Sequence, residues 1–251
     1  MRRILFFGLM MFVGLKAYGA DKEPIVVELF TSEGCSSCPP ADAVLTKLAK
    51  EKGTEIIPLA FHVDYWDRLG WKDTFSSAEY TRRQEGYAQS FRSDQIYTPQ
   101  MIVDGTTQFL GSDAAKARTS IAAATLKVKG HVDMTFGDTK GKKGSIGVTA
   151  KVNALPPERG EAEMILCITE DDLSSDVRRG ENAGSILRHT GVVRAWQPMG
   201  IVAMKDQSAE KSAEVKIDPS WKRENLHVVV LVQEKEGRRF LGVGTQRVGL
   251  K

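Results

Sequence analysis

The sequence predicts an α/β domain over residues 23–126, followed by an all-β, sandwich-like domain over residues 131–251. In the first part, apolar runs typical of strands alternate with helical patterns, which is the order of an α/β fold. A pair of cysteines lies where the first strand ends and the first helix begins. From His131 onward the pattern changes to short alternating runs with turn residues between them, as in β-sandwiches. The boundary is expected at residues 127–130.

The N-terminus has the features of a cleaved secretory signal over residues 1–20. Arg2 and Arg3 precede an apolar stretch, and small residues follow it. That stretch is shorter than the ~20 residues that a membrane-spanning helix needs, so we expect a periplasmic or secreted protein with no membrane anchor after cleavage. Loss of Arg2, Arg3 and Lys16 takes the formal charge from +3 to zero. A neutral mature chain argues against nucleic acid and anionic membranes as partners.

The first part reads as strand, helix, strand, helix, hairpin, helix. The strands are expected at residues 25–30, 56–63, 100–104 and 107–110, and the helices at 42–50, from Ser76 onward, and from Ser112 to about 126. Ser76 with Glu79 makes a capping box, and Asp104-Gly105 is a hairpin signal. Pro58 removes a backbone donor from the second strand, which indicates an edge position in the sheet.

The second part is expected to consist of short strands with alternating apolar residues. They are predicted at residues 131–136, 145–152, 162–169, 192–196, 213–217, 226–233 and 240–246. Gly, Pro and Asp residues mark turns between them.

Cys35 and Cys38 enclose Ser36 and Ser37 at the expected start of the first helix. The first N–H groups of a helix have no internal partner and carry partial positive charge, so a thiolate is favoured there. We therefore expect the pKa of Cys35 to be lowered, which makes it a nucleophile. Cys38 could then attack a mixed disulfide formed on Cys35 and release the substrate. The pair predicts thiol–disulfide exchange through a redox-active disulfide, with no other cofactor.

Long motifs surround this pair: residues 27–42 read VELFTSEGCSSCPPAD, residues 61–67 read FHVDYWD and residues 97–100 read YTPQ. Over residues 23–126 the chain resembles the thioredoxin-like superfamily in its glutaredoxin-like layout. The motifs more narrowly resemble a family of secreted bacterial proteins catalogued as a domain of unknown function. The superfamily resemblance implies that Pro99, after Thr98, is cis, packs against the cysteines and presents its neighbouring backbone to a bound chain. The narrower family implies no substrate.

Two groups of residues after the second strand are further candidates in this part. His62 and Asp64 alternate with apolar residues and could take the proton from Cys38 during resolution, or be a hydrogen-bonded histidine and a helix cap. Tyr65, Trp66 and Trp71, with Thr98, could wall a substrate groove, or simply pack beneath a long loop.

The second part has a polar cluster and a lone cysteine. Arg188 and His189, with Arg194 beyond them, could dock against the first part or bind an anion, or form a solvated connection between strands. Cys167 lies in an apolar strand pattern and is expected to be a buried, inert thiol, the alternatives being a third redox partner or an intermolecular bridge.

Three functions are compatible with these residues. The first is an exported thiol–disulfide oxidoreductase acting on protein thiols or disulfides, with an electron partner that the sequence does not identify. The second is a non-catalytic binding module with a structural disulfide. The third is a copper-handling protein that uses Cys35, Cys38 and His62. No second Cys-x-x-Cys or His pair supplies a fourth ligand, so we expect no metal.

Overall fold

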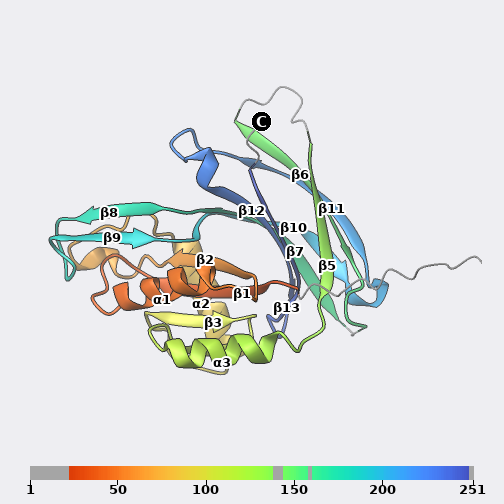
Figure 1. Cartoon of the computed structure of the whole chain (residues 1–251), viewed down its shortest axis with the longest axis horizontal. Coiled ribbons are helices and arrows are strands. Elements are labelled where there is room, and N and C mark those ends of the chain that lie inside the picture. The colour runs from red at the N-terminus through yellow and green to blue at the C-terminus, as the bar shows by residue number, and fades with distance from the viewer. Residues whose placement is uncertain (1–22, 138–143, 158–159, 249–251) are drawn as a thin grey trace, which may run out of the picture.

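The computed structural model (Figure 1) describes residues 23–137, 144–157 and 160–248, so the expected signal segment lies outside the described residues. Within these ranges no helix is long and apolar enough to cross a membrane. The α-helices are α1 (Pro39–Lys50), α2 (Ala78–Ser90) and α3 (Ala114–Ala124), and the first strands are β1 (Ile25–Thr31), β2 (Ile56–His62), β3 (Gln100–Val103) and β4 (Thr107–Leu110). The later strands are β5 (Gly130–Gly137), β6 (Ser145–Asn153), β7 (Glu161–Glu170), β8 (Leu173–Val177), β9 (Ser185–His189), β10 (Val192–Ala203), β11 (Ala209–Lys216), β12 (Leu226–Glu234) and β13 (Phe240–Arg247).

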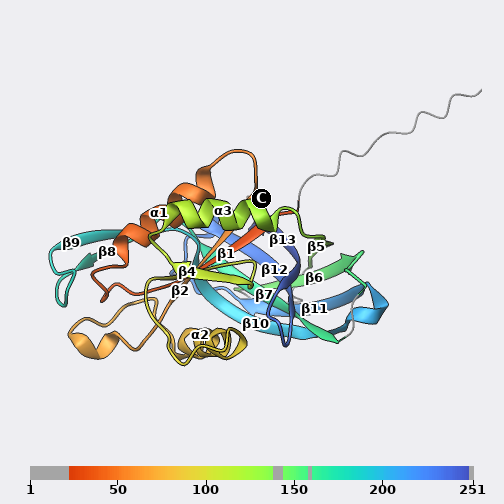
Figure 2. The same cartoon turned by 90° about the horizontal axis from the view of Figure 1, so that it is seen from below.

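The N-terminal half forms from four strands and the three helices. β1 pairs parallel with β2 and antiparallel with β3, and β3 pairs with β4. Helices α1 and α3 lie on one face of these strands and α2 on the other (Figure 2). Because both faces are covered, every residue of β1 is buried, which explains its unbroken apolar run. The β3–β4 turn has positive φ at Asp104 (48°) and Gly105 (71°), as the Asp-Gly signal predicts.

The caps of α2 and α3 lie one residue later than the sequence predicts, whereas α1 begins at Pro39, three residues before the predicted start. Ser77, not Ser76, caps α2, and its Oγ accepts the N–H of Glu79 at 3.2 Å. Asp113, not Ser112, caps α3. Adjacent polar residues have similar capping ability, so the choice between them depends on the direction in which the chain enters each helix.

The two halves share one sheet, which makes the predicted fold class wrong. The order of the eleven strands is β11-β6-β5-β13-β12-β7-β10-β2-β1-β3-β4. β10 pairs parallel with β2 through Val192 opposite Ala60, and the Ala60 N–H donates to the Gly191 carbonyl at 2.8 Å. The described part of the chain is therefore a mostly β structure, and its large mixed sheet contains strands from both halves. It is not a thioredoxin-like α/β domain joined to a separate β-sandwich.

The predicted edge position of β2 is also wrong, because β2 lies between β1 and β10. β10 begins opposite Ala60, so its ladder does not extend to Pro58. The missing N–H of Pro58 thus removes no bond from that ladder.

The C-terminal half curls around its own core and does not stack as two sheets (Figure 1). Alternating residues of β6, β7 and β12, such as Val148, Leu166 and Val230, face this core. The sheet closes on itself far enough for Gln197 of β10 to donate its side-chain N–H to the Glu214 carbonyl of β11, at 3.1 Å. The period-2 pattern is the same for a curled sheet and for a sandwich, so the sequence pattern does not distinguish them.

β8 and β9 form a separate two-stranded sheet that the sequence analysis did not predict. This hairpin extends from the large sheet past the N-terminal end of α1 (Figure 1). The residues that connect its strands, 178–184, contact the turn that contains the cysteines.

Candidate functional site

Cys35 and Cys38 form a disulfide at the start of α1, with their Cα atoms 5.4 Å apart. Cys38 is the residue that precedes the helix, and its carbonyl accepts the N–H groups of Ala41 (2.8 Å) and Asp42 (3.1 Å). Pro39 is the first helical residue, where a missing N–H removes no helical bond. The partial positive charge of the helix N-terminus therefore lies beside the disulfide.

Both cysteines are 0% exposed, whereas Ser36 and Ser37 between them are exposed. The Ser37 hydroxyl lies 3.3 Å from the Cys35 Sγ. In the disulfide form the two serines therefore meet solvent and the two cysteines do not. A thiol that attacks this disulfide must first gain access to it.

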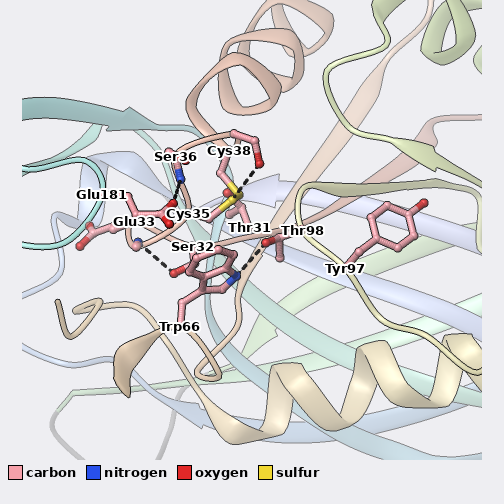
Figure 3. The surroundings of a disulfide bond; sticks show 12 residues. Thr31, Ser32, Glu33, Cys35, Ser36, Cys38, Trp66, Tyr97, Thr98 and Glu181 are labelled. Carbon is pink, nitrogen blue, oxygen red and sulfur yellow. Dashed lines mark hydrogen bonds between the residues drawn. A yellow bond between two sulfur atoms is a disulfide. The ribbon is translucent and has the colours of Figure 1, made fainter. Parts of the chain in front are cut away.

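Trp66 and the segment before β3 lie beside the disulfide (Figure 3). The indole N–H of Trp66 donates to Thr98 Oγ1 at 2.8 Å, and the Thr98–Pro99 peptide bond is cis, as the resemblance implies. Gly34 lies where Trp66 passes, and a Cβ on Gly34 would make a tight contact of 3.2 Å with Trp66 Cβ. Trp66 and Thr98 thus lie together next to Cys35.

A buried His–Asp pair lies behind this turn. His62, at the end of β2, donates from Nδ1 to Asp73 Oδ2 at 2.7 Å, and both side chains are fully buried. Burial acts to raise the pKa of Asp73, but the His62 contact and the N–H groups of Glu33 and Phe75 outweigh it, so that the pKa is lowered. Nε2 of His62 has no hydrogen-bond partner in the described part of the chain.

The C-terminal half contributes His189 to the same buried cluster. Its ring lies edge-to-face with the His62 ring, with centroids 4.9 Å apart, and its Nε2 is 3.5 Å from Glu33 Oε1. The other carboxylate oxygen of Glu33 accepts the indole N–H of Trp71 at 2.7 Å. Of the residues proposed from sequence, His62, Trp71 and His189 are therefore brought together.

Asp42 is a site residue to which the sequence analysis assigned no role. Its side chain, 8% exposed, lies four residues after Cys38 in α1 and accepts a hydrogen bond from Thr31 Oγ1 at 3.4 Å. Burial raises its pKa from 3.8 to about 7, with His189 opposing the rise. It also lines a groove between α1 and β9, together with Pro39 and the exposed Arg188.

Residues 181 and 182 bind directly to the cysteine turn. The Ser36 N–H donates to Glu181 Oε2 at 3.1 Å (Figure 3). Asn182 donates its side-chain N–H groups to the carbonyls of Glu33 and Cys35, each at 2.9 Å. The sequence analysis proposed roles for Arg188 and His189 nearby, but not for Glu181 and Asn182. The partners of Asn182 lie almost 150 residues away in the chain, and no local pattern indicates them.

The other sequence candidates make contacts of their own. Asp64 accepts the hydroxyl of Thr81 at 2.6 Å, and Tyr65 donates to Gln84 of α2 at 3.2 Å. Arg194 lies 3.6 Å from Glu170 and over the rings of Phe75 and Trp221. Cys167 is buried, and burial raises the pKa of its thiol.

In the described ranges no group of three or more His, Cys, Asp or Glu residues is arranged to hold a metal ion.

The fold is shared with proteins of known structure, although no curated protein matches the chain. The chain is similar to the X-ray structure of protein AGR_C_4864 from Agrobacterium tumefaciens, with 24% identity and a TM-score of 0.66 over 92% of this chain and 98% of that one. It is also similar to HBP35 of Porphyromonas gingivalis, with 14% identity and a TM-score of 0.64 over 90% of this chain and 76% of that one. The family model described as "Protein of unknown function (DUF1223)" matches residues 26–233, which include the disulfide turn and the β8–β9 hairpin, and the chain therefore belongs to this family.

Proposed function

We propose that this protein is an exported thiol–disulfide oxidoreductase that acts on protein thiols or disulfides, with Cys35 as the attacking and Cys38 as the resolving cysteine. The observation that carries the proposal is the Cys35–Cys38 disulfide at the N-terminus of α1. A thiolate on Cys35 would be stabilised by the positive end of the helix, which lowers the thiol pKa. The signal-like residues 1–20 support export to a compartment where disulfides persist.

The exchange needs only the two cysteines and a substrate with two thiols. A substrate thiolate attacks Cys35 Sγ, the Cys35–Cys38 bond breaks, and Cys38 leaves with the electron pair and takes a proton. The second substrate thiolate then attacks the substrate sulfur of the mixed disulfide and releases Cys35 as a thiolate. The substrate is oxidised and the protein is reduced by two electrons, and the reverse sequence reduces a substrate disulfide. The reduction potential of the couple sets the direction.

The test is a mixed-disulfide trap with the Cys38→Ser variant. This variant cannot resolve, so we expect it to accumulate disulfide-linked substrates in periplasmic extract, which reducing gels release. Cys35→Ser is the matched control and should trap none. In the reduced protein, Cys35 should be alkylated with a pKa well below the ~8.5 of a free cysteine. Absence of both the trap and the lowered pKa would contradict the proposal.

A second candidate is a non-catalytic binding module in which the disulfide is structural. The observation that favours it is the absence of any exposed surface on Cys35 and Cys38. This candidate predicts that the Cys35→Ser variant retains its binding partners and that native protein keeps the disulfide in excess thiol. The Cys38→Ser trap therefore separates the two candidates.

A further inference from the structure

The residues that connect β8 and β9, 178–184, form what we term the strap. The strap crosses from the C-terminal half onto the cysteine turn through Glu181 and Asn182. It also passes close to the segment that follows β2, since a Cβ on Gly180 would lie 3.2 Å from Trp71 Cβ. The strap is therefore packed against both the cysteine turn and the segment that follows β2.

Asn182 acts as a latch on the backbone of the turn. Its side chain is 8% exposed, and it donates to two carbonyls, those of Glu33 and Cys35, at 2.9 Å each. If the strap moved away, both carbonyls would lose these donors. Two buried hydrogen bonds thus favour the closed arrangement, in which the sulfur atoms have no exposed surface.

Glu181 places a negative charge on the N–H of Ser36, the residue that follows Cys35. Ser36 precedes α1 by three residues, so the carboxylate lies near the positive end of the helix that would stabilise a thiolate on Cys35. The carboxylate and a thiolate on the neighbouring residue would repel each other, because both are negative. Formation of the thiolate weakens the Glu181 contact, and the Glu181 contact disfavours the thiolate by the same free energy.

We propose that the strap is an autoinhibitory closure of the disulfide, with Asn182 as its latch and Glu181 as its redox-sensitive contact. The oxidised protein favours the closed strap, and a thiolate on Cys35 favours its release. The proposal rests on the proposed function, because it describes access to the same two sulfur atoms. Glu181 and Asn182 are positioning residues, since they act through the turn.

The latch is tested by the rate at which dithiothreitol reduces the disulfide in the native, full-length protein. We expect Asn182→Ala to raise the second-order rate constant roughly tenfold or more, the effect of losing two buried hydrogen bonds. Asn153→Ala, at the end of β6 in the same half, is the matched control and should leave the rate within about twofold of wild type. Urea unfolding of each variant establishes that faster reduction does not come from loss of the fold.

The charge is tested with Glu181→Gln, which keeps the size of an exposed side chain and does not endanger folding. In the reduced variant we expect a lower pKa for the Cys35 thiol. At acidic pH, each unit by which this pKa falls should make alkylation by iodoacetamide about tenfold faster. The reduction potential should rise, because the reduced form gains stability. Glu236→Gln, on the exposed β12–β13 turn, should change neither quantity.

These readouts do not depend on a protein substrate, so they separate the strap from the proposed function. Two results together would overturn the strap, even if Cys38→Ser traps substrates. The first is a reduction rate in Asn182→Ala within twofold of wild type, and the second is an unchanged pH profile of Cys35 alkylation in Glu181→Gln. Faster reduction in Asn182→Ala and a shifted pH profile in Glu181→Gln would support the strap whether or not Cys38→Ser traps substrates.

Discussion

Asp42 holds a carboxyl group in surroundings that favour its neutral form. Burial raises its pKa from 3.8 to about 7, although the nearby His189 opposes the rise. Below pH 4 both the folded and the unfolded chain carry a protonated Asp42, so its burial needs no proton uptake. Between pH 4 and 7 the unfolded chain releases this proton and the folded chain keeps it. The free energy of unfolding therefore falls as pH rises through this window.

Asp42→Asn should remove this pH dependence. Asn keeps the size and remains neutral, so we expect the variant to be more stable than wild type at pH 8, by on the order of 4 kcal/mol. At pH 4 the two proteins should have similar stability. Urea unfolding at both pH values measures the difference. Asp94→Asn, at an exposed position, is the control, and an equal effect at both pH values would contradict the assignment to Asp42.

Trp66 is a second residue whose role can be isolated. Trp66→Phe keeps an aromatic ring but removes the N–H that bonds to Thr98 Oγ1 at 2.8 Å. If this bond helps to keep the disulfide covered, reduction by dithiothreitol should become about fivefold faster, the factor that corresponds to one hydrogen bond. Trp221→Phe, in the C-terminal half, serves as the control. A rate equal to wild type would show that the bond has no part in covering the sulfur atoms.

At the scale of single residues, local sequence patterns predict some of the site and miss the rest. The spacing of Cys35 and Cys38 before a helix is a local pattern, and the structure places their disulfide at that helix start. Asp73 and Asn182 have no comparable signal, because their partners come from chain segments that only the fold brings near. Asp42 stood inside a recognised motif, but its raised pKa depends on burial that a motif does not reveal.

At the scale of elements, α2 is fixed to the sheet through a buried ion pair. Arg83 lies 2.6 Å from Glu28 Oε1 of β1 and stacks over the Trp196 ring of β10, 4.0 Å from its centroid. The Glu28 side chain is fully buried. Its acidic group interrupts an otherwise apolar strand, and its partner lies 55 residues further along the chain. The single helix α2 thus contacts strands from both halves.

Arg83→Ala should leave Glu28 buried without its cation. We expect the free energy of unfolding to fall by about 3–5 kcal/mol, because an unpaired buried charge is strongly destabilising. Arg82→Ala, the exposed neighbour on the same helix, should change it by no more than about 0.5 kcal/mol. The double variant Glu28→Gln with Arg83→Met should lose less than Arg83→Ala alone. Urea unfolding of wild type and the three variants decides this, and a double variant that loses as much stability as Arg83→Ala would argue against the pair.

The hairpin of β8 and β9 shows why one element was missed. β8 and the start of β9 alternate between exposed and less exposed residues, but the exposed positions include Ser174, Asp176 and Ile186. With few apolar residues on the covered face, the period-2 pattern is too weak to indicate strands. The apolar alternation of β6 and the longer apolar runs of β7 and β12 predicted those strands within a residue or two.

At the scale of the whole molecule, the larger error of the prediction lies in how the strands pair. β2 and β10 are separated by more than 100 residues, yet Val192 pairs with Ala60 and joins the two halves. The two halves also share the hydrophobic core under α2, where Phe30 and Phe61 pack in one cluster with Leu231 and Phe240. Such pairing depends on long-range packing, and apolar periodicity carries no information about it.

The shared sheet and core predict that both halves unfold together, and Gly191 tests this. Gly191 has φ of +65°, and a Cβ there would lie 2.4 Å from the Pro58 carbonyl oxygen, at the junction of β10 with β2. Gly191→Ala should therefore strain the junction and destabilise the protein. Gly53→Ala also has positive φ (+114°) but meets open space, so it controls for backbone strain alone.

Hydrogen exchange followed by mass spectrometry gives separate readings for the two halves. In Gly191→Ala we expect peptides from β1 and from β12 to lose protection together, and by a larger factor than in Gly53→Ala, because the clash adds to the strain. Both strands contribute to the core under α2, so opening of one exposes the other. If β12 kept wild-type protection while β1 lost it, the two halves would be independent folding units despite their common sheet.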